Sequence, residues 1–219
     1  VVLMALDHAN IFIAHAHPPA EMWGGPFPVF YDVVAFFTRF VTHFCAPGFF
    51  LLMGASMELF AASRRGAGWR RWAVTRYFLV RGAVLLAIKF LIVNRAWELT
   101  PGGRGIQVYA GVLFALAAGM LLGSVLLWLR PSILLALTAA LLIGMQFLVP
   151  PAGAWGPQTN PLALLLLVPG GMLNAAGDGT LLWVNYPVLP WLGLVTLGMV
   201  LGQWLAADPG KAYRRAWKL

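Results

Sequence analysis

The chain has 219 residues, of which 61% are hydrophobic and 10% are charged, and its mean hydropathy is +0.80. Soluble domains average about 45–50% apolar and about 25% charged residues, so this composition excludes an ordinary soluble domain and predicts one polytopic helical membrane domain. The formal net charge is +8, with the basic residues in short clusters between apolar runs. That distribution favours the positive-inside pattern of membrane proteins and argues against nucleic-acid binding.

The whole chain, 1–219, is expected to form a single transmembrane domain. Its one cysteine, Cys45, lies in an apolar run, so no intrachain disulfide can form. Val1 already belongs to an apolar run without a charged segment before it, which is unlike a cleaved signal peptide. We therefore expect a first helix that is shortened at its N-terminus.

Apolar runs that end at proline, glycine or basic residues predict an all-α bundle of about six spanning helices. They cover about Val1–Ala14, Val33–Ala62, Ala73–Asn94, Gly105–Leu129, Ser132–Val149 and Val188–Ala207. Pro47 and Gly48 are expected to kink or break the second helix. Residues 151–187 are expected to be mostly loop, apart from the short apolar stretch Leu162–Val168, which is interfacial or re-entrant.

The basic residues predict how these helices are oriented. If six helices alternate in direction, the loop 64–71, Arg130 and the C-terminal tail fall on one side, which we assign as cytoplasmic. The outer side then receives the His-rich loop after the first helix, the loop 95–104 and the segment 150–187.

Small residues recur at four-residue spacing in two of the predicted helices. They are Gly111, Ala115, Gly119 and Gly123 in the fourth helix, and Gly198 and Gly202 in the sixth. This pattern allows helix backbones to approach closely, and we assign it no chemistry.

The first helix carries Asp7, His8 and Asn10 inside an apolar run. Ionisable groups in a membrane are costly and commonly functional, and the histidine ring titrates near neutral pH. One interpretation makes His8 a base or an acyl-relay residue in a polar cavity. The other is a helix end with polar residues near the outer interface.

The second helix carries Asp32, Phe36, Arg39 and His43 on one face. This polar stripe could line a water-filled cavity, or it could form a structural tie between helices. Asp7 is the simplest buried partner for Arg39. In the third helix, Arg81 is expected to extend along apolar surface to the interface, and the role of Lys89 is left open.

Four arginines, Arg64, Arg65, Arg70 and Arg71, lie within eight residues. They could set the topology and attract anionic lipids, or they could bind the phosphates of a cytoplasmic cofactor through bidentate contacts. A metal site is not expected, because His15 and His17 have only Glu21 nearby as a further ligand.

Several runs of this chain resemble one known family. They are Leu6–His8, Phe37–Phe49, Gly54–Ser56 and Tyr186–Gly193. The chain is similar to bacterial membrane proteins related to the catalytic domain of heparan-alpha-glucosaminide N-acetyltransferase, within the transmembrane acyltransferase superfamily. The resemblance spans nearly the whole chain and implies a location in the bacterial inner membrane.

The resemblance implies that acetyl-CoA, or another acyl-CoA, binds from the cytoplasmic side and that the acyl group passes to an unknown acceptor on the outer face. His8 looks like the superfamily's helix-one histidine, whereas the active histidine of the lysosomal enzyme lies in the following loop, which here holds His15 and His17. Arg39 or His43 would stabilise negative charge, and the 64–71 arginines would hold the CoA phosphates.

Two other functions are weighed against this one. Polar stripes and a broken helix are also typical of a transporter or flippase, but no inverted repeat is visible. A non-catalytic membrane scaffold would not need intramembrane charge. Partners beyond the bilayer, acyl-CoA and the acceptor are not predicted, and a homo-oligomer is left open.

Overall fold

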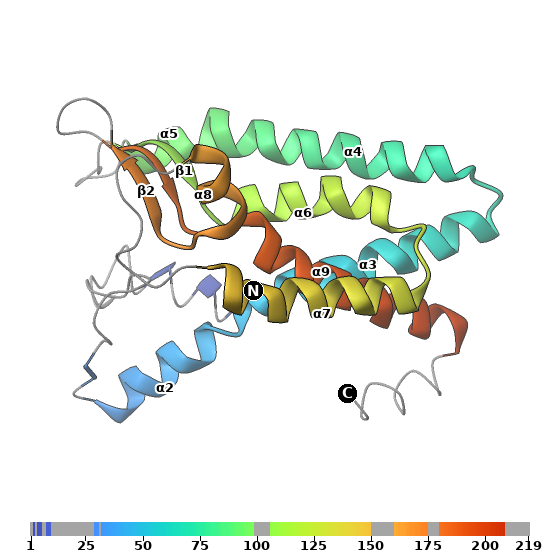
Figure 1. The fold of residues 1–219 in the computed structure, drawn as a ribbon, viewed down its shortest axis with the longest axis horizontal. Helices are drawn as coiled ribbons and strands as arrows, with labels where there is room; N and C mark the ends of the chain where they lie inside the picture. Colours follow the sequence, from blue (N-terminus) through green and yellow to red (C-terminus); the bar gives the residue numbers. More distant parts are fainter. Residues whose placement is uncertain are drawn as a thin grey trace.

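The structure is a computed structural model, and it describes residues 2, 4–5, 8–9, 29–30, 32–98, 106–149, 160–174 and 180–208. Figure 1 shows a bundle of long helices with a small sheet at one end. The helices are α2 (Val33–Thr42), α3 (Cys45–Gly66), α4 (Arg71–Ile88), a π-helix (Lys89–Val93), α5 (Asn94–Glu98), α6 (Val112–Leu126), α7 (Pro131–Leu148), α8 (Pro161–Leu167) and α9 (Val188–Ala207). The strands are β1 (Ile106–Ala110), β2 (Gly171–Asn174) and β3 (Thr180–Val184).

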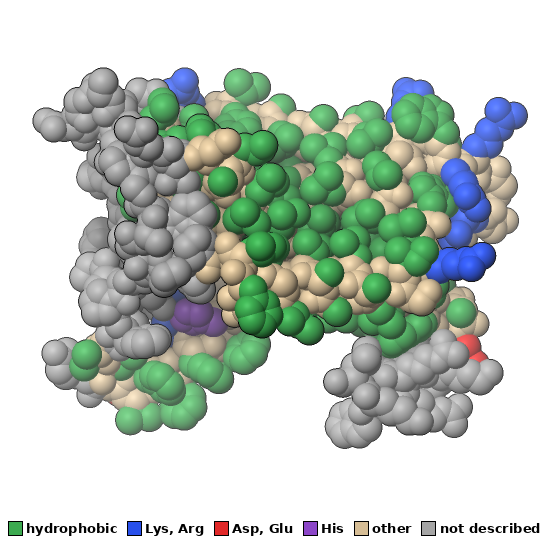
Figure 2. All heavy atoms as spheres, in the orientation of Figure 1, with side chains coloured by type: hydrophobic (Ala, Val, Ile, Leu, Met, Phe, Trp, Pro, Cys, Tyr) green, Lys and Arg blue, Asp and Glu red, His purple; other side chains and the backbone are tan. Residues whose placement is uncertain are grey.

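The helical bundle predicted from the sequence is confirmed. Helices α3, α4, α6, α7 and α9 run alternately in opposite directions along the bundle (Figure 1). Within the described part of the chain, four helical segments are long and apolar enough to cross a membrane, namely Val33–Gly66, Arg71–Ala96, Pro131–Leu148 and Val188–Ala207, whereas α6 is shorter. Large apolar side chains cover the middle of the bundle (Figure 2), as expected of a surface that faces lipid.

The second predicted helix is divided into α2 and α3. The break falls at His43 and Phe44, one turn before Pro47, as expected of a proline, which has no N–H to donate to the carbonyl oxygen four residues earlier and whose ring crowds that carbonyl. Pro47 is the third residue of α3, where a missing backbone N–H costs little because the first turn has no intrahelical acceptor for it. Figure 1 shows that α2 projects beyond the bundle at the end that carries the sheet.

The predicted fourth helix is wrong at its beginning, because residues 106–110 form β1 and α6 begins only at Val112. The segment 151–187, expected to be mostly loop, contains α8, β2 and β3 within its described residues. The short apolar stretch predicted at Leu162–Val168 corresponds to α8. Of the predicted first helix, the described residues are helical, and His8 is exposed.

The three strands are ordered β1-β3-β2. β1 pairs with β3 in parallel, with Tyr109 opposite Trp183, and β2 pairs with β3 in antiparallel. One face of this sheet is buried with α8 in a cluster of Ala110, Leu164, Val168, Leu182 and Val184. The sheet is thereby fixed to the end of the bundle where α4 ends and α6 begins (Figure 1).

Helices α3 and α9 form the closest helix pair, with backbone against backbone. A Cβ atom added at Gly54 would collide with the carbonyl oxygen of Val195, and one at Gly198 would collide with that of Leu51. At Gly202 it would lie 2.7 Å from the carbonyl oxygen of Ala55. The close packing predicted from Gly198 and Gly202 is confirmed, and its partner is α3.

We expect Gly198→Ala to destabilise the protein by about 1–3 kcal/mol, because the new methyl group meets backbone that cannot rotate away. Gly144→Ala in α7 is the matched control, since a Cβ there has no atom within 4 Å. It should leave stability unchanged or raise it by up to about 1 kcal/mol through helix propensity. Thermal unfolding in detergent measures both, and equal midpoints for the two variants would contradict the packing.

Candidate functional site

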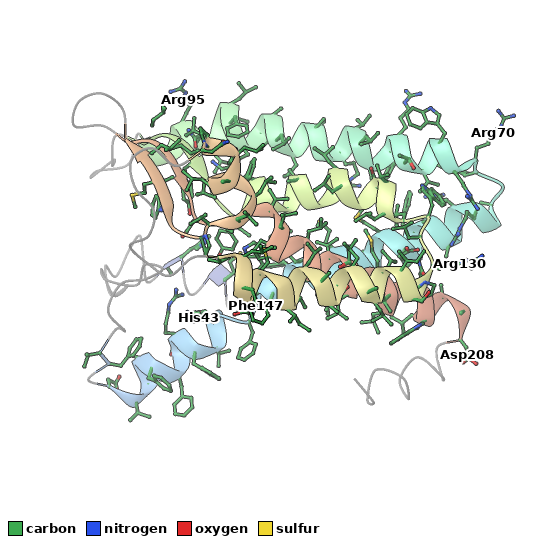
Figure 3. The ribbon with its side chains drawn as sticks, in the orientation of Figure 1. His43, Arg70, Arg95, Arg130, Phe147 and Asp208 are labelled. Atoms are coloured by element: carbon green, nitrogen blue, oxygen red, sulfur yellow. The ribbon has the colours of Figure 1, made fainter. Side chains whose placement is uncertain are left out.

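Four arginines gather where α3 ends and α4 begins: Arg64, Arg65, Arg70 and Arg71. Gly68, at φ +82°, makes the turn between the two helices. Arg130, which precedes α7, lies at the same end of the bundle (Figure 3). We call this the arginine end. The basic C-terminal tail, predicted to lie on the same side, falls outside the described residues.

Aromatic rings hold Arg64 in place. Its guanidinium carbon lies 4.9 Å from the ring centre of Phe60 and 5.0 Å from that of Trp69. Among the described residues its buried Nε has no hydrogen-bond partner. The guanidinium is therefore oriented by the two ring faces.

Trp128 forms a second aromatic platform at this end. The guanidinium carbons of Arg65 and Arg71 lie 5.8 and 5.4 Å from its ring. The indole N–H donates to the hydroxyl of Thr75 at 2.9 Å, and this hydroxyl donates to the carbonyl oxygen of Ser124 at 3.3 Å. The platform is thus fixed to α4 and α6, and it brings arginines from two helices together.

The helix ends add to the positive potential of the arginine end. α4 begins with Arg70 and Arg71, α7 begins after Arg130, and neither helix has an acidic residue in its first turn. A helix N-terminus carries partial positive charge, so cations there are unfavourable and an anion is favourable. The arrangement suits a ligand with several negative charges, such as a polyphosphate.

Glu58 is a buried carboxylate that sequence reasoning missed. It lies in α3, is 1% exposed, and accepts a hydrogen bond from the amide of Gln203 in α9 at 2.8 Å. The same amide nitrogen donates to the carbonyl oxygen of Leu129 at 3.1 Å, and Glu58 interacts electrostatically with Arg65. Glu58 therefore links α3, α9 and the end of α6 beneath the arginine end. Its position inside an apolar run was the available signal.

The predicted residues Arg39 and His43 come together at the opposite end, where α2 stops. The Arg39 guanidinium donates to the hydroxyl of Thr42 at 3.2 Å, and this hydroxyl donates to the Arg39 carbonyl oxygen at 2.8 Å. His43 Nδ1 lies 2.7 Å from the same carbonyl oxygen. Because a carbonyl oxygen only accepts, Nδ1 is the donor in this contact, and Nε2 is the second nitrogen of the ring.

The remaining predicted residues are not joined to this pair by the described contacts. Asp32 caps α2, where its carboxylate accepts the backbone N–H of Val34 at 3.1 Å. His8 is exposed on a helical turn. Asp7, His15 and His17 lie outside the described residues.

Lys89, whose role was left open, is 1% exposed. Its ammonium donates to Oδ1 of Asn94 at 3.0 Å and lies against the ring of Tyr109. Arg81 is exposed and donates to the Tyr77 hydroxyl at 2.5 Å, which directs its charge toward the arginine end. No group of three or more His, Cys, Asp or Glu side chains that could hold a metal occurs among the residues that the structure describes.

The long apolar helices, with charged and polar side chains gathered at both ends of the bundle, define a helical membrane protein. Residues 27–218 match the model of a family described as heparan-alpha-glucosaminide N-acetyltransferase, catalytic. The chain belongs to this family, which is a family of membrane acyltransferases. The search of curated proteins found no match, and neither did the search of solved structures.

We expect Gln203→Ala to lower the free energy of unfolding by about 1–3 kcal/mol, because it leaves the buried Glu58 carboxylate without its hydrogen-bond donor. Gln146→Ala in α7 is the control, since its exposed amide lies 3.5 Å from its acceptor. That change should stay within about 0.5 kcal/mol. Denaturation in mixed micelles measures both, and a neutral Gln203→Ala would show that Glu58 does not need this partner.

Proposed function

We propose that the protein transfers an acyl group, acetyl in the first instance, from acyl-CoA bound at the arginine end to an acceptor at the sheet end. The observation that carries the proposal is the arginine end itself. The guanidiniums of Arg64, Arg65 and Arg71 are held by aromatic rings, and α4 and α7 both begin at this end without an acidic residue in their first turn. In a chain of this family, the diphosphate and the further phosphate of CoA fit that charge.

The proposed orientation follows from the same charge. The arginine end faces the cytoplasm, where acyl-CoA is made, and the sheet end faces the outside. The membrane is proposed to be the inner membrane of a bacterium. The acceptor then reaches His43 and Arg39 from the outer surface.

The two ends are far apart. Helix α3 separates His43 from Arg64, which at 1.5 Å per residue is a distance of about 30 Å. No side chain reaches across that length, so the acyl group travels on the flexible arm of the donor into the bundle. The CoA phosphates stay at the arginine end while the thioester approaches the histidines.

The chemistry proposed at the sheet end is general-base catalysis. His43 Nε2, or a histidine of the first helix or of the loop after it, takes a proton from an amine or hydroxyl of the acceptor. The acceptor atom bonds to the thioester carbonyl carbon, the carbon–sulfur bond breaks, and the CoA thiolate leaves and is then protonated. Arg39 and Asp7 are proposed to stabilise the developing charges.

We expect Arg64→Gln combined with Arg71→Gln to weaken CoA binding at least about 10-fold, because hydrogen bonds to charged groups contribute about 1.5–3 kcal/mol each. Titration calorimetry in detergent at two salt concentrations measures this, and the wild-type affinity should fall as salt rises.

Arg95→Gln is the control for that experiment, and Arg64→Gln alone is the variant of equal charge with which it is compared. Arg95→Gln removes one positive charge from an exposed residue at the opposite end of the bundle (Figure 3), so CoA affinity should not change. Equal losses in both variants would mean a general charge effect. No CoA binding by the wild type, together with ion or lipid flux in vesicles, would replace this proposal with a transporter.

We expect His43→Ala or His8→Ala to slow acyl transfer about 10²–10⁴-fold, because that is the usual contribution of a general base. The measurement is thiol release from acetyl-CoA by the protein in vesicles. Glucosamine serves as the acceptor probe, because the family description names a glucosaminide. CoA affinity should stay at its wild-type value in both variants. Undiminished turnover in one variant would remove that histidine from the mechanism.

A further inference from the structure

Lys89 is a buried cation with no anionic partner among the residues that the structure describes. Its side chain is 1% exposed, and its only described hydrogen bond goes to Oδ1 of Asn94. The rings of Tyr109 and Phe90 lie 5.2 and 5.7 Å from Nζ. Within the described part of the chain no carboxylate pairs with it, so two of the three ammonium N–H donors have no acceptor there.

The π-helix is what joins Lys89 to Asn94. Residues five apart in an α-helix point about 140° away from each other, whereas the wider π turn brings them to one face. The backbone N–H of Asn94 donates to the carbonyl of Lys89, which closes that turn. π turns of this kind recur at functional sites.

Asn94 connects this lysine to the sheet. Its Oδ1 accepts both from Lys89 Nζ and from the backbone N–H of Tyr109 in β1, each at 3.0 Å. The Tyr109 ring packs on Trp183 of β3, with ring centres 5.1 Å apart. The ammonium is therefore fixed between α4 and the sheet, at the end opposite the arginine end.

A buried ammonium is costly unless an anion compensates it, and intramembrane charges of this kind mark binding sites and transfer paths. Oxygen anions match both the charge and the unfilled donors of Lys89.

We propose that Lys89, Asn94 and Tyr109 form a subsite for an oxyanion, a carboxylate, sulfate or phosphate group, carried by the molecule that receives the acyl group. Its assignment to the acceptor rests on the proposed function. The oxyanion accepts the two remaining N–H bonds of Lys89 and neutralises the ammonium. The anionic group belongs either to a soluble acceptor or to a lipid headgroup.

The test measures thermal unfolding of the purified chain in neutral detergent while sulfate, phosphate or acetate replaces chloride at constant ionic strength. A second arm compares nanodiscs of phosphatidylglycerol with nanodiscs of phosphatidylcholine. In one arm, the unfolding midpoint of the wild type should rise saturably, by roughly 5 °C or more when the anion is at a hundredfold excess over its Kd. That arm identifies the source of the oxyanion.

Two substitutions assign the rise to Lys89. Lys89→Met removes the charge, and Asn94→Asp supplies an internal carboxylate at the position that already accepts from Lys89 and Tyr109. In the absence of the anion, both variants should have an unfolding midpoint no lower than that of the wild type. Adding the anion should no longer raise the midpoint of either variant. Arg95→Gln, the control, should keep the rise. If Lys89→Met does not fold, Asn94→Asp decides alone.

The subsite is overturned if the wild type shows no rise in either arm, or if Asn94→Asp shows the wild-type rise. CoA titration of the same preparations separates this result from the proposed function. If CoA does not bind but the anion raises the unfolding midpoint through Lys89, the proposed acyl transfer is contradicted and the subsite is not. If CoA binds normally but the anion does not raise the midpoint, the subsite is contradicted and acyl transfer is not.

Discussion

The contact between the backbones of α3 and α9 is the constraint on which the rest of the bundle depends. It exists because Gly54, Gly198 and Gly202 present no side chain where the two helices cross. In lipid, where water does not drive helices together, such close packing is a main source of association. Because the backbones touch, Glu58 of α3 reaches Gln203 of α9, and the end of α3 that carries the arginines is held against α6.

Much of this fold could be predicted from the sequence, since apolar runs of spanning length have few alternatives in a membrane. The break in the second predicted helix was expected at Pro47 and Gly48, and it falls one turn before Pro47, at the residues whose helical bonding a proline disrupts. The misplaced feature, β1, was set by distant pairing. β1 continues directly into an apolar run, so it was predicted as helix, and its strand character depends on β3 far along the chain.

The residues of the candidate site likewise fall into those that could be predicted from the sequence and those that could not. The arginines could be found because they are neighbours in sequence, and Arg39 and His43 because they share one helical face. Glu58 and Lys89 could not be interpreted in this way, because their meaning depends on Gln203 and Tyr109, which belong to other elements. A charged residue inside an apolar run can be seen in the sequence. Whether an opposite charge lies beside it is known only from the folded structure.

The parallel pairing of β1 with β3 has a consequence for biogenesis. The whole of α6, α7, α8 and β2 lies between the two strands, so β1 lacks its partner strand β3 until the ribosome has made most of the chain. Helices α3 and α4 can enter the bilayer early, while the strand pairing of β1, which places Tyr109 beside Lys89, is completed only late in translation. Maturation of the sheet end therefore trails insertion, and a nascent chain arrested before β3 would be membrane-embedded yet unfinished there.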